Sequence, residues 1–334
     1  MRLSLGMLVR KTLTLIGVAL SLVGACSRVS AAQGGARYAL LVQGASGEEQ
    51  YATLHRGWLD SLAMTFRDKF KYDAAHLTVL AEQPKAGEQK ATAESVKAAF
   101  ERFATQLTPS DQLAVVLIGH GGGQGADAKF NLIGPDLSVS EWATLLKPVR
   151  GRLIIVDTTS ASFAYLAGLA APNRIVITAT NRAAQQFHTV FAQGFVGAFS
   201  SQDADADKNG RTSLLEAFNY ASRVVKQSYE QKGTMATETA AIDDTGEGTV
   251  REATAAGPNG ASAALTYFDA VETPATSDPE LARLFATRAS LTEQIDDLRR
   301  RRTSMPAADY DKEFERLTTE LAVVSRDVRR KTGG

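Results

Sequence analysis

The stretch Leu113-Ala-Val-Val-Leu-Ile-Gly-His-Gly-Gly-Gly123 is the part of the sequence that most strongly indicates the fold of this chain. Its first six residues are apolar without a polar break, which is typical of a strand buried on both faces of a parallel sheet. His120 and the glycines beside it then lie at the carboxyl end of the strand, where open α/β sheets bind their ligands. The stretch therefore predicts an imidazole beside free backbone N–H groups at the rim of a sheet, an arrangement used in nucleophilic catalysis.

A second apolar strand, Arg152-Leu-Ile-Ile-Val-Asp157, ends in the hydroxyl-rich segment Thr158-Thr-Ser-Ala-Ser162. Parallel strands end at one edge of their sheet, so we expect this segment to lie beside His120 and to offer it a nucleophile. The chain has one cysteine, Cys26, and that residue lies in the N-terminal targeting segment. The pattern is therefore that of a cysteine hydrolase whose thiol is missing.

Short β-rich runs alternate with helical stretches along residues 38–179. This alternation predicts an α/β fold in which a mostly parallel sheet lies between two layers of helices, a three-layer sandwich. We expect strands at 38–42, 77–80, 113–118, 153–157 and 175–179, and helices at 51–69, 93–107, 140–146 and 163–169.

Residues 1–26 predict an export signal, because a positively charged start precedes a short apolar stretch at 13–25. Two cleavage sites fit. The tetrapeptide at 23–26 resembles a lipobox, in which Cys26 is acylated and anchors a periplasmic lipoprotein, whereas Ser30-Ala-Ala32 would release a soluble form. We favour the lipobox because the lone cysteine directly follows the apolar stretch.

The charge balance argues against nucleic acid as a partner. Lys and Arg together number 37, as do Asp and Glu, and aromatic residues make up 7% of the chain. A basic run at Arg299–Arg302 lies near the end of an expected helix, where cations are favourable. No stretch beyond the export signal is apolar for long enough to cross a membrane, so we expect membrane contact only through a lipid on Cys26.

The last part of the chain differs in character from the rest. Residues 251–276 are rich in Ala, Thr, Gly and Pro and predict a linker with one short strand at 263–268. Apolar residues then recur in four–three steps on both sides of Pro306, which predicts an antiparallel helical hairpin, or coiled coil, over 277–331. A capping box at Ser277–Glu280 would begin it. The hairpin could be a neutral cap on the main domain, or it could bind another protein or a second copy of the chain.

Residues 36–250 form the expected main domain, and most of it resembles the caspase-like fold shared by caspases and legumain-type peptidases. The resemblance is closest to bacterial legumain-like proteins. It rests on the strand ending Gly119-His-Gly121, the strand ending Asp157-Thr-Thr-Ser160, the strand Arg174–Thr180, the helix at 191–199 and the phrase Phe130-Asn-Leu-Ile-Gly-Pro-Asp136.

Active members of that family use a His–Cys dyad, so the resemblance implies that Thr159 stands at the position of the cysteine. His120 would be the base, and the backbone N–H of Gly121 would belong to the oxyanion hole. A threonine hydroxyl is far less acidic than a thiol, and its methyl group crowds the approach. No third group is evident to orient the imidazole. The resemblance therefore implies a catalytically impaired homologue that binds a protein or peptide, by strand addition at the mouth of its cleft.

Two other functions stay open. Thr159, Ser160 or Ser162 could pair with His120 in an active hydrolase, or the chain could act as a scaffold through the hairpin. His120 could also be a turn histidine that only caps backbone groups. Arg182, in the loop after the strand at 175–179, is a weak candidate for substrate contact.

A twelve-residue segment, Asp205-Ala-Asp-Lys-Asn-Gly-Arg-Thr-Ser-Leu-Leu-Glu216, matches the EF-hand loop. Its oxygen donors would be Asp205, Asp207, Asn209, the backbone of Arg211, Ser213 directly or through water, and Glu216. A hard cation needs this density of oxygen atoms in a short arc. The segment therefore predicts a structural Ca²⁺ site, and the alternative is an acidic turn that caps the following helix.

Overall fold

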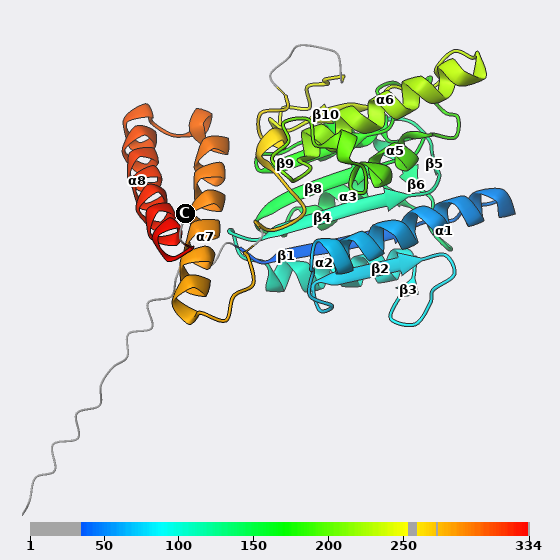
Figure 1. Cartoon of the computed structure of the whole chain (residues 1–334). Helices are drawn as coiled ribbons and strands as arrows, with labels where there is room; N and C mark the ends of the chain where they lie inside the picture. The colour runs from blue at the N-terminus through cyan, green and yellow to red at the C-terminus, as the bar shows by residue number, and fades with distance from the viewer. Residues whose placement is uncertain (1–34, 253–258, 272, 333–334) are drawn as a thin grey trace, which may run out of the picture. The chain divides into compact units, whose positions relative to one another are not determined.

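The computed structural model describes residues 35–252, 259–271 and 273–332 (Figure 1). The export signal, the two cleavage sites and Cys26 lie outside the described residues. Within the described part of the chain, no helix is both long and apolar enough to span a bilayer.

A seven-stranded sheet forms the centre of the molecule, with the strand order β10-β9-β8-β4-β1-β2-β3. All neighbouring strands run parallel except β10, which is antiparallel to β9 at one edge. The strands are β1 (Arg37–Gln43), β2 (Leu77–Ala81), β3 (Gln89–Lys90), β4 (Gln112–Ile118), β8 (Arg152–Asp157), β9 (Arg174–Thr178) and β10 (Ala241–Asp243). This sheet confirms the predicted α/β class and the parallel pairing of the two strands that carry the candidate site.

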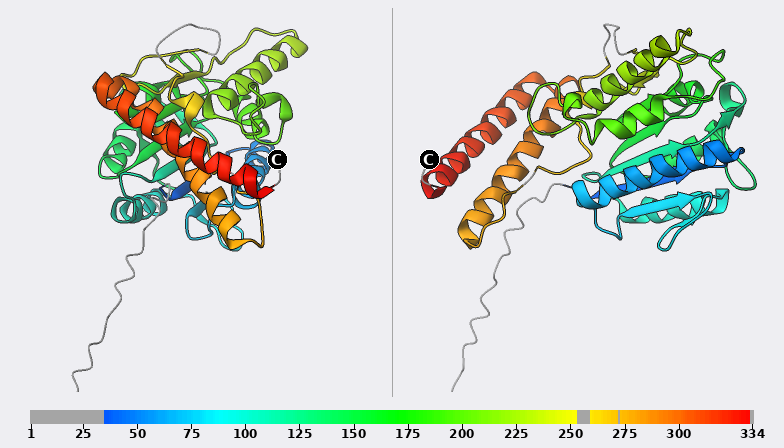
Figure 2. Two further views of the ribbon diagram at one scale, coloured as in Figure 1. Left: turned by 60° about the vertical axis from the view of Figure 1, so that its left-hand side comes forward. Right: turned by 45° about the vertical axis from the view of Figure 1, so that its right-hand side comes forward.

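Helices cover both faces of the sheet, as the alternation predicts (Figure 2). On one face α1 (Glu49–Met64), α5 (Phe191–Ala198) and α6 (Leu214–Lys232) pack on strand residues such as Val116 and Val156. On the other face α2 (Ala93–Gln106), α3 (Val139–Leu146) and α4 (Phe163–Leu169) pack on the alternate residues, such as Val115 and Ile155. Because both faces are covered, every residue of β4 is buried, which explains its continuous apolar run.

A three-stranded antiparallel sheet begins directly after His120. Its strands, in the order β5-β6-β7, are β5 (Gly121–Gly122), β6 (Lys129–Phe130) and β7 (Leu137–Ser138). The chain leaves the large sheet at Gly119, whose φ of +149° is a conformation that residues with a Cβ atom rarely adopt. The glycines of the deciding stretch therefore allow the turn between the two sheets.

Part of the segment expected as a linker packs into the core. Phe268 is fully buried, and its ring centre lies 5.0 Å from that of Phe66 and 5.3 Å from that of Phe199. The short strand expected at 263–268 is instead a 3-10 turn at Ala263–Leu265 followed by a single bridge between Tyr267 and Ser213. No second strand of any length lies alongside this segment among the described residues, so it makes only that one bridge.

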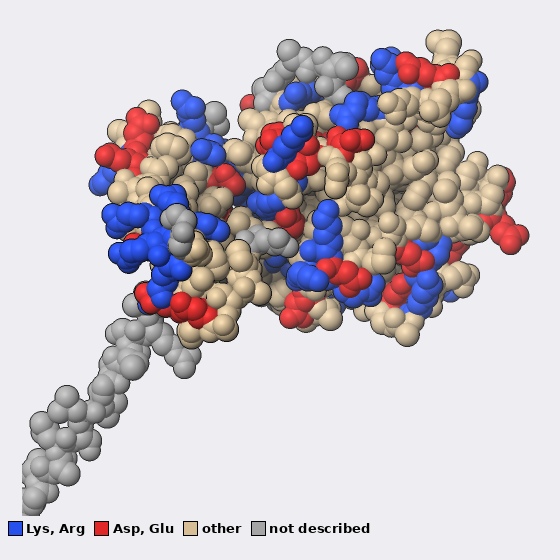
Figure 3. All heavy atoms as spheres, in the orientation of Figure 1, with Lys and Arg blue, Asp and Glu red and all other residues tan. Residues whose placement is uncertain are grey.

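The C-terminal hairpin is formed by α7 (Pro279–Arg300) and α8 (Ala307–Thr332), which confirms the predicted pair of helices. Four residues, Leu291, Ile295, Leu298 and Leu317, form its own buried cluster. The N-cap is Asp278 rather than Ser277, because Pro279 occupies the first helical position and the Asp278 carboxylate accepts from two N–H groups of the first turn. On the face in Figure 3, Lys and Arg side chains form a patch on the hairpin with acidic side chains beside it, and charges of both signs are interspersed over the rest.

Candidate functional site

The ends of β4 and β8 lie side by side, as the sequence predicts. Leu117 pairs with Asp157 in parallel register, and the backbone N–H of Thr158 donates to Leu117 at 3.0 Å. Thr159 therefore reaches Gly121. A Cβ atom on Gly121 would lie 2.8 Å from Thr159 Oγ1, so only glycine fits at this position.

The three hydroxyl candidates are all buried. Thr159 is 0% exposed, and its Oγ1 has no hydrogen-bond partner among the described residues. Ser160 donates to the carbonyl oxygen of Gly121 at 3.2 Å, and Ser162 pairs with Thr180 at 3.0 Å. Within the described chain, no hydrogen bond joins any of these hydroxyl groups to the imidazole of His120.

The backbone of Gly121 faces the Thr159–Ala161 segment rather than solvent. The N–H of Asn131 donates to the carbonyl of His120, so the antiparallel alternation turns the N–H and C=O of Gly121 away from β6. Its C=O accepts the Ser160 hydroxyl on that side, and a Cβ atom on Gly121 would lie 3.0 Å from the Cβ atom of Ala161. An acyl oxygen that accepted the Gly121 N–H would therefore lie next to the Thr159–Ala161 segment.

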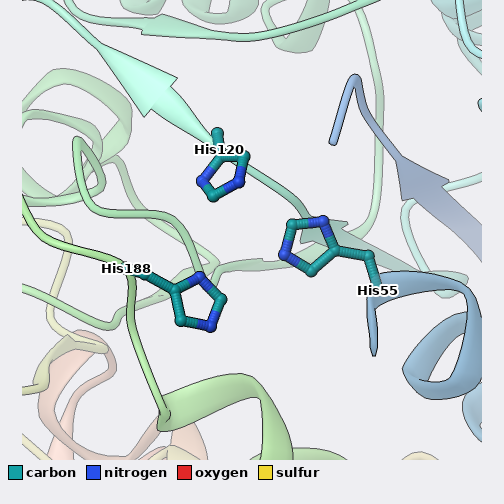
Figure 4. A group of neighbouring side chains, drawn as sticks. All are labelled: His55, His120 and His188. Atoms are coloured by element: carbon teal, nitrogen blue, oxygen red, sulfur yellow. The ribbon is translucent and has the colours of Figure 1, made fainter. Parts of the chain in front are cut away.

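His120 points toward α1 and the loop before α5, and two further histidines lie there (Figure 4). Its ring centre is 5.0 Å from that of His55 and 5.7 Å from that of His188, with the Tyr51 ring at 4.9 Å. One ring nitrogen from each histidine lies within 4.8 Å of the other two. The sequence reasoning missed His55 and His188. The available signal was scarcity, since the whole chain has four histidines and three of them gather here.

Burial lowers the pKa of each member of this histidine cluster (His55, His120 and His188) and so favours the neutral imidazole. Loss of hydration, reinforced by the two neighbouring imidazoles, lowers the pKa of His55 to about 3. Burial also lowers the pKa of His120, partly offset by the backbone of Ser46, and burial lowers the pKa of His188, helped by His120. Neutral imidazole is the form that ligates metals and accepts protons.

One nitrogen of His55 is satisfied and the other is not. Its Nδ1 lies 3.1 Å from Ser46 Oγ, which also accepts from Gln43 Nε2 at 3.3 Å. The Nε2 atom is buried and has no hydrogen-bond partner among the described residues. A buried polar atom left without a partner costs about 1–3 kcal/mol, so this atom needs an explanation.

A surface pocket of about 270 Å³ opens beside the histidine cluster. His188 forms part of its wall, together with Tyr51 and Trp58 from α1 and Lys232 from the end of α6. The neighbouring Phe187 is 66% exposed, which is unusual for a side chain of this size. Arg182, the weak candidate for substrate contact, is exposed, donates to Asn181 Oδ1 and is not among the residues lining this pocket.

The predicted calcium loop brings its acidic residues together. Carboxylate oxygens of Asp205, Asp207 and Glu216 lie within 4.8 Å of one another. Asp205 accepts the N–H groups of Asn209 and Gly210, which bends the loop around its first carboxylate. Three carboxylates at this separation repel one another, and a cation between them would offset that repulsion. The loop thus offers oxygen donors of the kind that Ca²⁺ prefers.

Both ends of that loop are tied to Glu216. One oxygen accepts the N–H groups of Ala206 and Asp207, and the other accepts the N–H and hydroxyl of Ser213 in a capping box at the start of α6. The side chain of Arg211 points elsewhere, since it forms an ion pair with Asp269 at 2.9 Å. Only the backbone of Arg211 is then left for the loop, as its predicted role requires.

Asp157 gives the site a testable pH dependence. Burial raises its pKa to about 7, against the opposing effect of the Thr159 N–H that donates to it. Between about pH 4 and pH 7 the folded chain therefore keeps a proton on Asp157 that the unfolded chain has released. The stabilisation of the fold by this proton is complete below about pH 4 and is lost as the pH rises through 7. Asp157→Asn should therefore gain stability relative to the wild type as the pH rises over that window. Urea unfolding at several pH values measures this, with the exposed Asp203→Asn as the control; parallel pH curves for wild type and Asp157→Asn would contradict it.

No protein-family model and no curated protein matches the chain, whereas solved structures are similar to it. A protein of Geobacter sulfurreducens is similar to it with a TM-score of 0.41 and 14% identity, over 67% of this chain and 95% of that one. The initiator caspase Dronc of Drosophila is similar with a TM-score of 0.41 and 13% identity, over 73% of this chain and 92% of that one. At this level neither similarity bears on what the chain binds or catalyses.

Proposed function

We propose that this chain is an exported, lipid-anchored peptidase homologue of caspase-like fold that does not hydrolyse acyl bonds and acts by binding a protein or peptide. The observation that carries the proposal is that, among the described residues, no hydroxyl of the Thr158–Ser162 segment forms a hydrogen bond with the imidazole of His120. A serine or threonine needs a base within hydrogen-bond reach to become a nucleophile. Here Thr159 is enclosed, and Ser160 donates its proton to a backbone carbonyl.

The pocket beside the histidine cluster supports the binding half of the proposal. Aromatic and apolar side chains line it from α1, namely Tyr51, Leu54 and Trp58. Lys232 adds a positive charge at its rim, and the exposed Phe187 lies next to His188 in the chain. Aromatic residues around a small polar group are the composition that recurs at the centres of protein interfaces.

Filling the pocket should abolish peptide binding. Extended peptides selected from a displayed library against the wild-type chain should bind Ser228→Arg at least about tenfold more weakly, because the long side chain would occupy the pocket wall that α6 provides. Gln227→Arg, the adjacent exposed position outside the pocket, is the matched control. Equal binding to both variants would contradict the proposal. Loss of binding only on deletion of residues 277–334 would favour a scaffold that acts through the hairpin.

The chain should also fail to react with an acyl-type probe. A fluorophosphonate labels an activated serine or threonine, and we expect no labelling of the wild type above that of the His120→Ala variant. Labelling of a known serine hydrolase under the same conditions is the positive control for the probe. Labelling at Ser160 or Thr159 that disappears in His120→Ala would establish the alternative, an active hydrolase.

A second proposal concerns the loop Asp205–Glu216, which we infer to hold a structural Ca²⁺ ion. The converging carboxylates of Asp205, Asp207 and Glu216 support it, and the glycine at position six has a φ of +86°, as the sharp bend requires. The ion would join the end of the loop after α5 to the start of α6. It would thereby stabilise the helical layer that covers the histidine cluster.

Calcium should therefore raise the thermal stability of the chain. At a hundredfold excess over its dissociation constant, a ligand of the folded state adds about 2.7 kcal/mol, or roughly 5 °C in Tm for a chain of this size. Asp205→Asn and Glu216→Gln should abolish the shift, and the second variant keeps a side chain that can still complete the capping box. Asp203→Asn, just outside the loop, should keep it. A Tm that is insensitive to both calcium and chelator would remove the site.

A further inference from the structure

We propose that His55, His120 and His188 bind one divalent transition-metal ion of the zinc class, with a fourth coordination position open to the adjacent pocket. The ligands come from three separate parts of the chain, which are α1, the end of β4 and the loop before α5 (Figure 4). The inference does not rest on peptide binding, since metal binding is measured without a peptide.

The donor set selects the class of metal. Three imidazoles without a carboxylate suit zinc and its first-row neighbours, whereas calcium and magnesium prefer oxygen. A zinc ion bound to nitrogen at about 2.1 Å holds its ligand atoms about 3.4 Å apart. The ring nitrogens here lie within 4.8 Å of one another, so side-chain adjustments of about 1 Å would close the site.

His55 supplies an independent observation that points to a ligand. It is 0% exposed, and its Nδ1 is held by the hydroxyl of Ser46, while its Nε2 has no partner among the described residues. If Nδ1 carries the proton donated to Ser46, Nε2 presents its lone pair to the other two rings. A metal-binding histidine usually has this second hydrogen bond, which fixes the tautomer and the direction of the ring.

Three protein ligands would leave one position of a tetrahedral ion for a further ligand. Three protein ligands and one open position are typical of zinc sites that bind water or a substrate, whereas closed structural sites use four protein ligands. His188 belongs both to the cluster and to the pocket wall, so a water molecule or an oxygen atom of a pocket ligand could reach the metal from that side. A metal on His120 would also occupy the lone pair that a general base needs.

Cobalt is the probe for this site, because its visible spectrum reports the coordination geometry. The full chain carrying Cys26→Ser, so that no thiol competes, is first saturated with calcium. Co²⁺ should then bind one equivalent with the intense visible absorption of a four-coordinate ion, and Zn²⁺ should displace it. His188→Gln should weaken binding more than about 100-fold, and Ser46→Ala, which removes only the outer hydrogen bond, by about 10–100-fold.

His76→Gln is the matched control, because His76 is the one remaining histidine of the chain and packs on Tyr38 instead. It should bind Co²⁺ as the wild type does. Circular dichroism checks folding, and the half-exposed His188 is the ligand whose replacement disturbs the core least. The absence of a stoichiometric spectrum, undiminished affinity in His188→Gln, or loss of binding in His76→Gln would each overturn the site. The Ser228→Arg variant distinguishes the two proposals, because it should lose peptide binding and still bind Co²⁺.

Discussion

The parallel pairing of β4 with β8 is the constraint on which the rest of the site depends. It fixes two strand ends at one edge of the sheet, so the chain must place His120 and Thr159 close together. The same pairing also determines the side on which each residue lies. Ile118, two residues before His120, packs with α1, α5 and α6, whereas Ile155, four residues before Thr159, packs with α2, α3 and α4. The contacts beyond the strand ends show a similar division, because the His120 ring lies near His55 of α1, whereas the Thr159 hydroxyl lies near Gly121 at the start of β5.

This division explains the chemistry of the site. On the α1 side the ring of His120 lies beside two imidazoles and the ring of Tyr51. On the other side Thr159 lies against Gly121, and its backbone N–H donates to the carboxyl group of Asp157. A hydroxyl in that position is part of the core. His120 lies near His55, whose Nε2 has no hydrogen-bond partner in the described part of the chain, and this atom is the basis of the metal site proposed above.

The fold could be predicted because its signals are local. Continuous apolar runs identify buried strands, and the four–three spacing around Pro306 identifies the hairpin. The convergence of Asp205, Asp207 and Glu216 is local as well, since the three carboxylates come from one twelve-residue segment. The position of Phe268 could not be predicted, because two adjacent aromatic residues, Tyr267 and Phe268, in a segment rich in small residues give no period.

The histidine cluster has no local signal at all. His55, His120 and His188 are separated by more than sixty residues in each interval, and only the stacking of α1 and the α5 loop over the end of β4 unites them. His120 could be identified as important from its strand and its glycines. Its partners could not, because the resemblance to a hydrolase directs attention to the hydroxyl-bearing strand.

The nitrogen NMR spectrum of the imidazoles tests most directly which side His120 faces. With only four histidines, a chain labelled with ¹⁵N at histidine gives four ring systems that single substitutions can assign. The account predicts that replacing His55 shifts the ring nitrogens of His120, whereas Thr159→Ala leaves them unchanged. A His120 ring that responds to Thr159→Ala and ignores the loss of His55 would contradict it.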